Sequence, residues 1–198
     1  ILGIVLRHPA TITGDGEHTI AQLIAQSNEQ RKAITEILGP IVIDQECLMK
    51  FKEYGVDEQY IPRKNERLIL NYTSNAHRGG TYETVSNNIC RENRRLLRQI
   101  TRLLNLPLAG IDVECADLSR PLNRSNGVII EVNCKPNVEI HEQPLAGNKQ
   151  MVTRSMMRYF IYRHPLLYIK ALYRARQLAV YAKSSIALML FALVYLLV

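Results

Sequence analysis

The chain has 198 residues, of which 47% are hydrophobic and 22% are charged, enough for one sizeable core and a small additional segment. The net charge of +7 is placed unevenly, because residues 151–198 hold seven basic residues and no acidic one. The first 150 residues balance 18 basic against 18 acidic side chains, so we expect no nucleic-acid partner. Four cysteines without CxxC spacing argue against a zinc site and favour reduced thiols in a cytoplasmic protein.

The first part of the chain predicts a strand followed by two helices. Residues 1–6 are apolar and predict a strand already under way, so we expect the chain to lack an upstream half. After a glycine-bearing turn, apolar residues at helical spacing predict a helix that Thr19 caps. Asp44 is expected to cap a short second helix, which Gly55 ends.

The next part predicts three strands, a loop and one amphipathic helix. The segment 67–72 has the pattern of a strand, and a polar loop with two glycines follows at 74–81. Leucines at helical spacing predict a helix over 92–105 with its leucine face in the core. The segments 108–116 and 128–134 predict two strands joined by a turn. Together these elements indicate an α+β fold with an antiparallel sheet and flanking helices, not a doubly wound parallel fold.

Three polar side chains carry the clearest chemical signal. Glu131 and Asn133 lie two residues apart on the last strand and share a face, and Asp112 lies on the strand before it. Three oxygen donors at one point suit Mg²⁺ and the phosphates that it binds. The pattern predicts a metal site, and the alternative is a set of unrelated polar residues at strand ends.

Four separated motifs resemble those of the ATP-grasp carboxylate–amine ligases, in the order that this family shows. The motifs are Arg7-His8-Pro9-Ala10 with Gly14 to Ile20, Ser74 to Thr81, Asp112, and Glu131-Val132-Asn133 followed by Pro136. They cover about residues 1–147 and are similar to the C-terminal half of the ATP-grasp domain of several enzymes. These enzymes are cyanophycin synthetase, bifunctional glutathione synthetase, N-acetylglutaminylglutamine synthetase and the ligases that add glutamate to ribosomal proteins.

The resemblance implies a ligase that phosphorylates a carboxylate with ATP and lets an amine attack the acyl phosphate. The substrates would be an amino acid or small peptide carboxylate and an amino acid amine, with ATP and Mg²⁺ or Mn²⁺ as cofactors. By matched position, the resemblance implies metal ligands at Asp112, Glu131 and Asn133, an adenine contact at Ile130, and phosphate or carboxylate contacts at Asn75, Arg78, Gly79 and Gly80. Asn75 and Arg78 would be the catalytic members of the last group.

The chain departs from the family pattern at several positions. Relatives carry Arg two or four residues before the loop Asn, where this chain has Thr73 and Asn71. Arg78 or Lys135 would have to replace the missing cation. The Gly after the motif Pro is Asn137, which also tolerates a left-handed backbone. The half with the ATP-clamping lysines and the glycine-rich lid is absent from this chain.

These departures keep two further functions open. One is a catalytically degenerate ATP-grasp module that binds nucleotide or peptide at the membrane. The other is a structural membrane adaptor that binds no nucleotide.

The basic C-terminal region predicts membrane association from its composition. We expect 148–183 to be a basic, amphipathic helical segment that Pro165 breaks, and 184–198 to be an apolar anchor, although a spanning helix needs about 20 apolar residues. Basic residues before an apolar stretch suit the cytoplasmic, inner face of a membrane. The alternative is a helix packed on the upstream domain, and a homo-oligomer also stays open.

Overall fold

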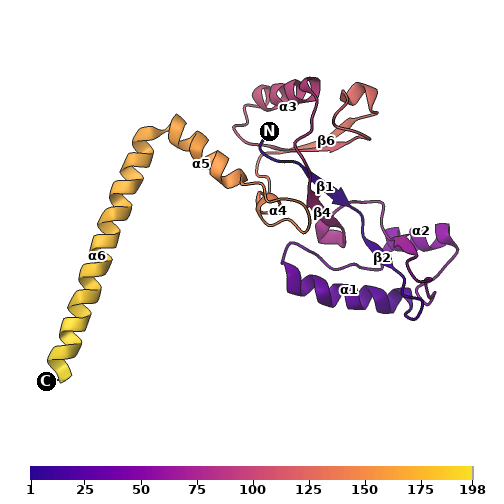
Figure 1. Ribbon diagram of the computed structural model, residues 1–198, viewed down its shortest axis with the longest axis horizontal. Helices are drawn as coiled ribbons and strands as arrows, with labels where there is room; N and C mark the ends of the chain where they lie inside the picture. Colours follow the sequence, from indigo (N-terminus) through magenta and orange to yellow (C-terminus); the bar gives the residue numbers. More distant parts are fainter. Residues whose placement is uncertain (198) are drawn as a thin grey trace. The chain divides into compact units, whose positions relative to one another are not determined.

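The computed structural model describes the backbone of residues 1–197 and the side chains of residues 1–181 and 185. The chain divides into two units, Ile1–Met151 and Val152–Val198. The first unit holds β1 to β6 and α1 to α4, and the second holds α5 and α6 (Figure 1). Domain boundaries at 147/148 and 183/184 stay predictions. The proposed anchor, 184–198, lies outside the described side chains except at Ser185.

Within residues 1–197, the strands form three two-stranded antiparallel sheets. The α+β fold with antiparallel strands is therefore confirmed. The pairs are β1 (Val5–His8) with β4 (Thr81–Thr84), β2 (Thr11–Thr13) with β3 (Arg67–Ile69), and β5 (Gly110–Glu114) with β6 (Val128–Asn133).

The strands predicted at 1–6 and 67–72 are shorter in the structure, and two strands were missed. β1 begins only at Val5, where its pairing with β4 begins, and β3 ends at Ile69. β2 and β4 lie in segments whose sequences indicate a turn and a loop. These short strands are defined by their partners across the sheet, because three or four residues carry too little periodicity of their own.

The first two helices begin and end where local signals predict. α1 (Ile20–Ile34) starts with a capping box formed by Thr19. α2 (Gln45–Tyr54) starts at the cap residue Asp44 and ends at Gly55, which has a φ of 68°. The main core of the unit lies between these helices and the β2–β3 sheet (Figure 1). Its buried members are Ala10, Ile12, Ile20, Ile24, Ile41, Cys47, Phe51, Leu68 and Leu70.

The helix α3 (Arg91–Leu103) forms as predicted, but the prediction that its leucine face is in the core is wrong. Leu96, Leu103 and Leu104 are exposed, and Leu103 is 77% accessible. Asn93 is instead buried, and its side chain makes three hydrogen bonds to the backbone of residues 118–122. Polar contacts to this segment hold the helix, while Leu97 and Ile100, which were also predicted to face the core, are only half-buried.

The remaining elements of the first unit are short. They are the 3-10 turns η1 (Ala76–Arg78) and η2 (Leu122–Arg124) and the helix α4 (Glu139–Glu142). α4 contributes Ile140 to a second, smaller apolar cluster around the buried Tyr82.

The second unit consists of α5 (Val152–Arg163) and α6 (Pro165–Leu197). The predicted break at Pro165 is confirmed, since this residue is the first of α6, a position at which proline needs no backbone N–H donor. Among the described residues, no helix is long and apolar enough to cross a membrane.

Candidate active site

The β5–β6 pair brings the three predicted metal-binding residues together. Asp112 and Glu131 are direct cross-strand partners, so their side chains share one face of the sheet. Asn133 lies on the same face and donates from Nδ2 to Glu131 Oε1 at 2.6 Å. A register shift between Asp112 and Val113 marks a bulge, which re-aims side chains at the point where this cluster lies.

The chemistry of this donor set fits a hard divalent cation. Two carboxylates and one amide oxygen are ligands that Mg²⁺ and Mn²⁺ accept. Among the described residues, no three His, Cys, Asp or Glu side chains converge as a metal-binding group. The amide of Asn133 would therefore complete the set with Asp112 and Glu131, and the ligand role of all three stays a prediction.

Arg7 belongs to this cluster, although sequence reasoning gave it no chemical role. It lies on β1 and donates from Nη1 to Asp112 Oδ2 at 3.0 Å. The contact places a permanent cation on one of the predicted metal ligands. The motif that begins at Arg7 could have pointed to a role for this residue, but it does not show that Arg7 contacts Asp112.

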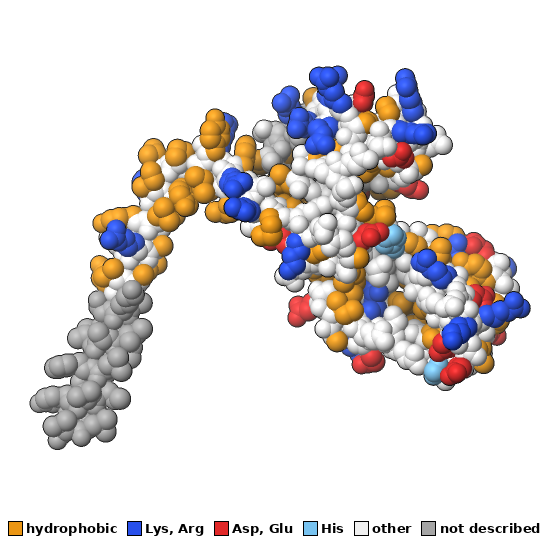
Figure 2. All heavy atoms as spheres, viewed as in Figure 1, with side chains coloured by type: hydrophobic (Ala, Val, Ile, Leu, Met, Phe, Trp, Pro, Cys, Tyr) orange, Lys and Arg blue, Asp and Glu red, His pale blue; other side chains and the backbone are white. Residues whose placement is uncertain are grey.

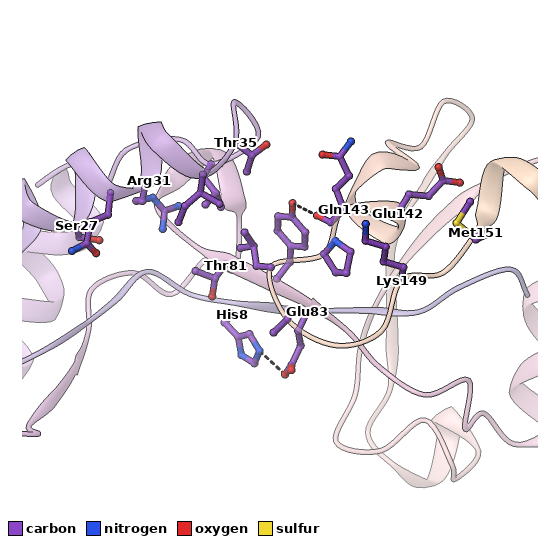
Figure 3. Close-up of a pocket in the computed structure, with 17 residues that line it drawn as sticks. His8, Ser27, Arg31, Thr35, Thr81, Glu83, Glu142, Gln143, Lys149 and Met151 are labelled. Carbon is purple, nitrogen blue, oxygen red and sulfur yellow. Dashed lines mark hydrogen bonds and ion pairs between the residues drawn. The ribbon is translucent and has the colours of Figure 1, made fainter.

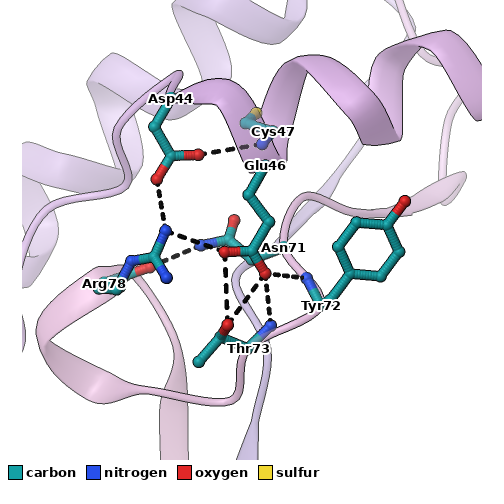
Figure 4. Close-up of polar contacts among 7 residues, drawn as sticks. All are labelled: Asp44, Glu46, Cys47, Asn71, Tyr72, Thr73 and Arg78. Atoms are coloured by element: carbon teal, nitrogen blue, oxygen red, sulfur yellow. Dashed lines mark hydrogen bonds and ion pairs between the residues drawn. The ribbon is translucent and has the colours of Figure 1, made fainter.

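The glycine-bearing loop is held against the start of α2 by two carboxylates (Figure 4). Glu46 accepts hydrogen bonds from the backbone N–H groups of Tyr72 at 2.6 Å and Thr73 at 2.7 Å. The guanidinium of Arg78 lies 2.6 Å from Asp44 Oδ2 and 2.9 Å from Glu46 Oε2. We refer to Asp44, Glu46, Thr73 and Arg78 as the α2 clasp.

The charges of the α2 clasp stabilise one another. The hydrogen bond from the Cys47 N–H, followed by that from Arg78, lowers the pKa of Asp44. Burial alone would raise the pKa of Glu46, but hydrogen bonds from Thr73 and Tyr72 outweigh it and hold that pKa below its ordinary value. The hydrogen bond to Asp44 raises the pKa of Arg78. All three groups are therefore charged at neutral pH, and the two carboxylates compete with any phosphate for Arg78.

Asn71 and Thr73, at the two positions where the resemblance predicts Arg, both make hydrogen bonds within the loop region and supply no cation. Asn71 is 2% exposed and donates from Nδ2 to the carbonyl of Arg78 at 3.0 Å. Its Oδ1 atom has no hydrogen-bond partner among the described residues. The Thr73 hydroxyl donates to Glu46 at 3.0 Å.

The local structure of the loop explains, without any ligand, why these positions hold Asn75, Gly79 and Gly80. Asn75 Oδ1 accepts from the His77 N–H at 2.9 Å and so caps η1. Gly79 has a φ of 85°, and a Cβ at Gly80 would lie 2.5 Å from the carbonyl oxygen of His8. The N–H of Gly80 already donates to the Asn75 carbonyl at 2.8 Å. Contacts of these residues and of Arg78 with phosphate stay predictions.

Ile130, the predicted adenine contact, lies at the bulge beside the metal-binding residues. It lies at the register shift of β6, because Asp112 pairs with Glu131 and Val113 pairs with Ile129, which leaves Ile130 without a cross-strand partner. Its side chain is 62% exposed, so the surface is open to a planar ring. The adenine role is untested and stays a prediction.

A cavity of about 1000 Å³ opens beside the end of the glycine-bearing loop (Figure 3). Its wall includes Thr81 and the buried Arg31, which donates to the carbonyl of Gly80 at 2.7 Å. Burial lowers the pKa of Arg31. The cavity also carries groups of both charge signs, among them His8, Glu83, Glu142 and Lys149. Such a wall suits a ligand that has both an ammonium and a carboxylate group.

No family model matches the chain, but known proteins resemble it over most of its length. Cyanophycin synthetase of Synechocystis sp. is 33% identical over 150 residues, which cover 74% of this chain. The glutathione biosynthesis bifunctional protein GshAB of Mannheimia succiniciproducens is 27% identical over 161 residues, or 79% of the chain. The structure of a bifunctional glutathione synthetase from Pasteurella multocida matches with a TM-score of 0.63 and 26% identity over 82% of the chain. The chain is a relative of the ATP-grasp ligases.

These similarities confirm the resemblance to ATP-grasp ligases and the α+β ATP-grasp fold. The chain spans only part of its relatives, namely 17% of the cyanophycin synthetase, 21% of the bifunctional protein and 23% of the solved glutathione synthetase chain.

Proposed function

We propose that this chain carries the metal-binding part of an ATP-dependent carboxylate–amine ligase. A substrate carboxylate attacks the γ-phosphorus of ATP and forms an acyl phosphate and ADP. An amine then attacks the acyl carbon, the C–O bond to the phosphate breaks, and an amide and inorganic phosphate result. The observation that carries this proposal is the face shared by Asp112, Glu131 and Asn133 in a relative of ATP-grasp ligases.

The residues of the cluster have distinct roles in this proposal. Asp112, Glu131 and Asn133 would hold Mg²⁺ or Mn²⁺, which neutralises charge on the phosphates of ATP when it is bound. Asn133 orients Glu131 through their hydrogen bond, and Arg7 orients Asp112. Arg7 also brings a fixed positive charge to the point where negative charge develops during phosphoryl transfer.

Arg7 is our proposed replacement for the cation that Asn71 and Thr73 do not supply. Arg78 lies between two carboxylates, whereas Arg7 has one carboxylate partner, which is itself a proposed metal ligand. Binding of a divalent cation by Asp112 would compete with this ion pair. Arg7 would then be released toward the phosphate.

We propose an amino acid or small peptide carboxylate and an amino acid amine as the substrates. The cavity beside Thr81 supports this class, because its wall offers groups of both charge signs. ATP is supplied in the cytoplasm, and we place the activity there.

A second candidate is a degenerate ATP-grasp module that binds nucleotide or peptide at a membrane without turnover. The observation that favours it is the pairing of Arg78 with Asp44 and Glu46, together with Asn and Thr in place of Arg at positions 71 and 73. Such a module would bind Mg²⁺-ATP and would release no ADP.

The test is ADP release by the full-length protein with Mg²⁺-ATP and a panel of amino acids and dipeptides. Stimulation by one carboxylate–amine pair is expected from the ligase, and Glu131→Gln should reduce it at least about a hundredfold. Glu114→Gln is the matched control, since Glu114 lies on the same hairpin but pairs with Val128, outside the cluster. A thermal shift with Mg²⁺-ATP and no ADP release with any pair would favour the degenerate module.

A further inference from the structure

The described part of the second unit exposes cations without any acidic neighbour in its own sequence. Residues 152–198 contain no Asp or Glu, so the cations of this unit have no acidic side chain of their own unit to pair with. All six basic side chains that the structure describes here are exposed, namely Arg154, Arg158, Arg163, Lys170, Arg174 and Arg176 (Figure 2). The unit therefore carries positive charge that no acidic side chain of its own compensates at neutral pH.

The same two helices expose large apolar side chains between the cations. Tyr162 is 86% and Leu166 is 73% accessible. The exposed set in this unit is Met157, Tyr159, Phe160, Tyr162, Leu166, Leu167, Ile169, Leu172, Tyr173, Leu178, Val180 and Tyr181. An apolar surface of this extent indicates a binding partner.

These side chains lie all around α6 and not along one stripe. Successive residues of a helix are separated by about 100°, so Leu167, Leu172 and Tyr173 lie at least about 100° from one another around the helix axis. Exposed cations lie between these apolar side chains, so the helix presents basic and apolar groups on several sides, whereas one flat protein face would cover only one side. A lipid headgroup region, which can deform around the helix, fits this distribution better than a flat protein surface does.

Charge decides between the possible partners. The same surface of a second copy would bring the same cations and no acidic side chain, so these two surfaces would repel one another. An anionic bilayer offers phosphates to Lys and Arg and hydrocarbon to the leucines, while tyrosines suit the boundary between the two. Basic helices with large apolar side chains are typical of peripheral attachment to such a surface.

We propose that α5 and residues 165–181 of α6 form a docking surface for an anionic lipid bilayer. The surface binds the headgroup region without needing to span the membrane. This inference does not depend on the ligase activity, because it concerns a different unit and a different ligand.

The first experiment is vesicle co-sedimentation of the full-length protein. The vesicles are phosphatidylcholine alone and an equal mixture of phosphatidylcholine and phosphatidylglycerol. Binding to the mixed vesicles that weakens as salt increases is the expected result, because salt screens attraction between exposed charges. Equal binding to both vesicle types, or binding to neither, would overturn the proposal.

Charge variants locate the surface. Arg154, Arg158 and Arg163 replaced together by Gln should lower the partition coefficient by roughly two orders of magnitude. The matched control replaces Arg95, Arg98 and Arg102 of α3, which are also exposed, and removes the same charge from the first unit. An equal loss in both triple variants would show attraction by net charge alone and would overturn the assignment to α5.

A fluorescent reporter tests burial of the apolar side chains, because the chain contains no Trp. Phe160→Trp introduces a reporter at an exposed position of α5, and its emission, measured against that of the unmodified protein, should shift to the blue when mixed vesicles are added. An unshifted emission on sedimenting protein would contradict apolar insertion. A stable dimer that ignores vesicles would identify the surface as a contact between copies instead.

Discussion

Arg7 and Arg78 are the two guanidinium groups associated with the proposed chemistry, and their surroundings differ. Arg78 contacts two carboxylates of the α2 clasp, at 2.6 and 2.9 Å, whereas Arg7 contacts one carboxylate, at 3.0 Å. Removal of an arginine from an exposed ion pair costs little stability, since such pairs contribute about 0–1 kcal/mol. Loss of activity can therefore be separated from loss of fold at both positions.

Arg7→Gln should lower turnover by about a hundredfold while it changes the free energy of unfolding by less than about 1 kcal/mol. The reason is that Arg7 meets the proposed metal ligand Asp112, where charge would develop. Arg78→Gln is the comparison and should retain turnover within about tenfold of the unmodified protein. ADP release and urea unfolding of both variants provide the check. A larger loss in Arg78→Gln would assign the missing cation to Arg78.

Gly79→Ala should destabilise the protein by more than Gly55→Ala. Both glycines have positive φ, 85° and 68°, so alanine costs about 1–2 kcal/mol of backbone energy at either position. A Cβ at Gly79 would also lie 2.8 Å from Ile41, whereas nothing lies within 4 Å of a Cβ at Gly55. The difference between the two urea-unfolding energies measures the close approach of the loop to Ile41. Equal losses would contradict this packing.

The α2 clasp should make the free energy of unfolding depend on pH in the acidic range. Asp44 and Glu46 have pKa values below their ordinary values of 3.8 and 4.5. A carboxyl with a lowered pKa in the folded state contributes stability that is present above the ordinary pKa and is lost as the pH falls through the folded pKa. Asp44→Asn should therefore be less stable than the unmodified protein at neutral pH. The difference should shrink as the pH falls below 3.8. Urea unfolding over this range is the measurement, and a constant difference would contradict the linkage.

The helix α3 depends on a polar anchor more than on its leucines. Asn93→Ala should cost roughly 2–4 kcal/mol, because its side chain makes three hydrogen bonds to buried or partly buried backbone groups. Leu103→Gln is the control on the same helix and should change the free energy of unfolding by no more than about 0.5 kcal/mol. Thermal or urea unfolding of both variants decides the matter. The reverse order would restore the leucine face as the contact surface.

The elements that sequence predicted correctly are those with local signals. Thr19, Asp44, Gly55 and Pro165 act on residues within one helical turn, so their effect can be read without knowledge of the fold. The shared face of Glu131 and Asn133 follows from strand geometry in the same way. The position of Asp112 beside them could be predicted because the two strands that pair are neighbours in the sequence.

The features that sequence missed depend on distant partners. β2 and β4 exist because β3 and β1 pair with them. Arg7 meets Asp112 across 105 positions of the chain, and Asn93 is buried by a segment 25 to 29 residues away. No pattern within these short segments encodes such contacts, and the amphipathic spacing of α3 pointed to its leucines instead.

Residues 148–150, just before the boundary between the two units, make hydrogen bonds to the rest of the first unit. The side chain of Gln150 accepts from the backbone N–H of Ile4 at 3.0 Å and donates to the carbonyl of Val85 at 2.8 Å. Thr84 donates through its hydroxyl to the carbonyl of Asn148 at 2.7 Å. Residues 148–150 therefore close the edge of the β1–β4 sheet, although the sequence pattern places the domain end at 147.

A chain ending at Met151 should accordingly unfold at a higher urea concentration than a chain ending at residue 147. The shorter chain loses the bonds made by Asn148 and Gln150, and at about 1 kcal/mol for each hydrogen bond the expected deficit is roughly 2–4 kcal/mol. Gln150→Ala in the longer chain is the matched control and should reproduce about half of that deficit, because it removes only the side-chain bonds. Equal stability of the two chains would support a domain end at residue 147. It would also show that the contacts of Gln150 do not stabilise the fold.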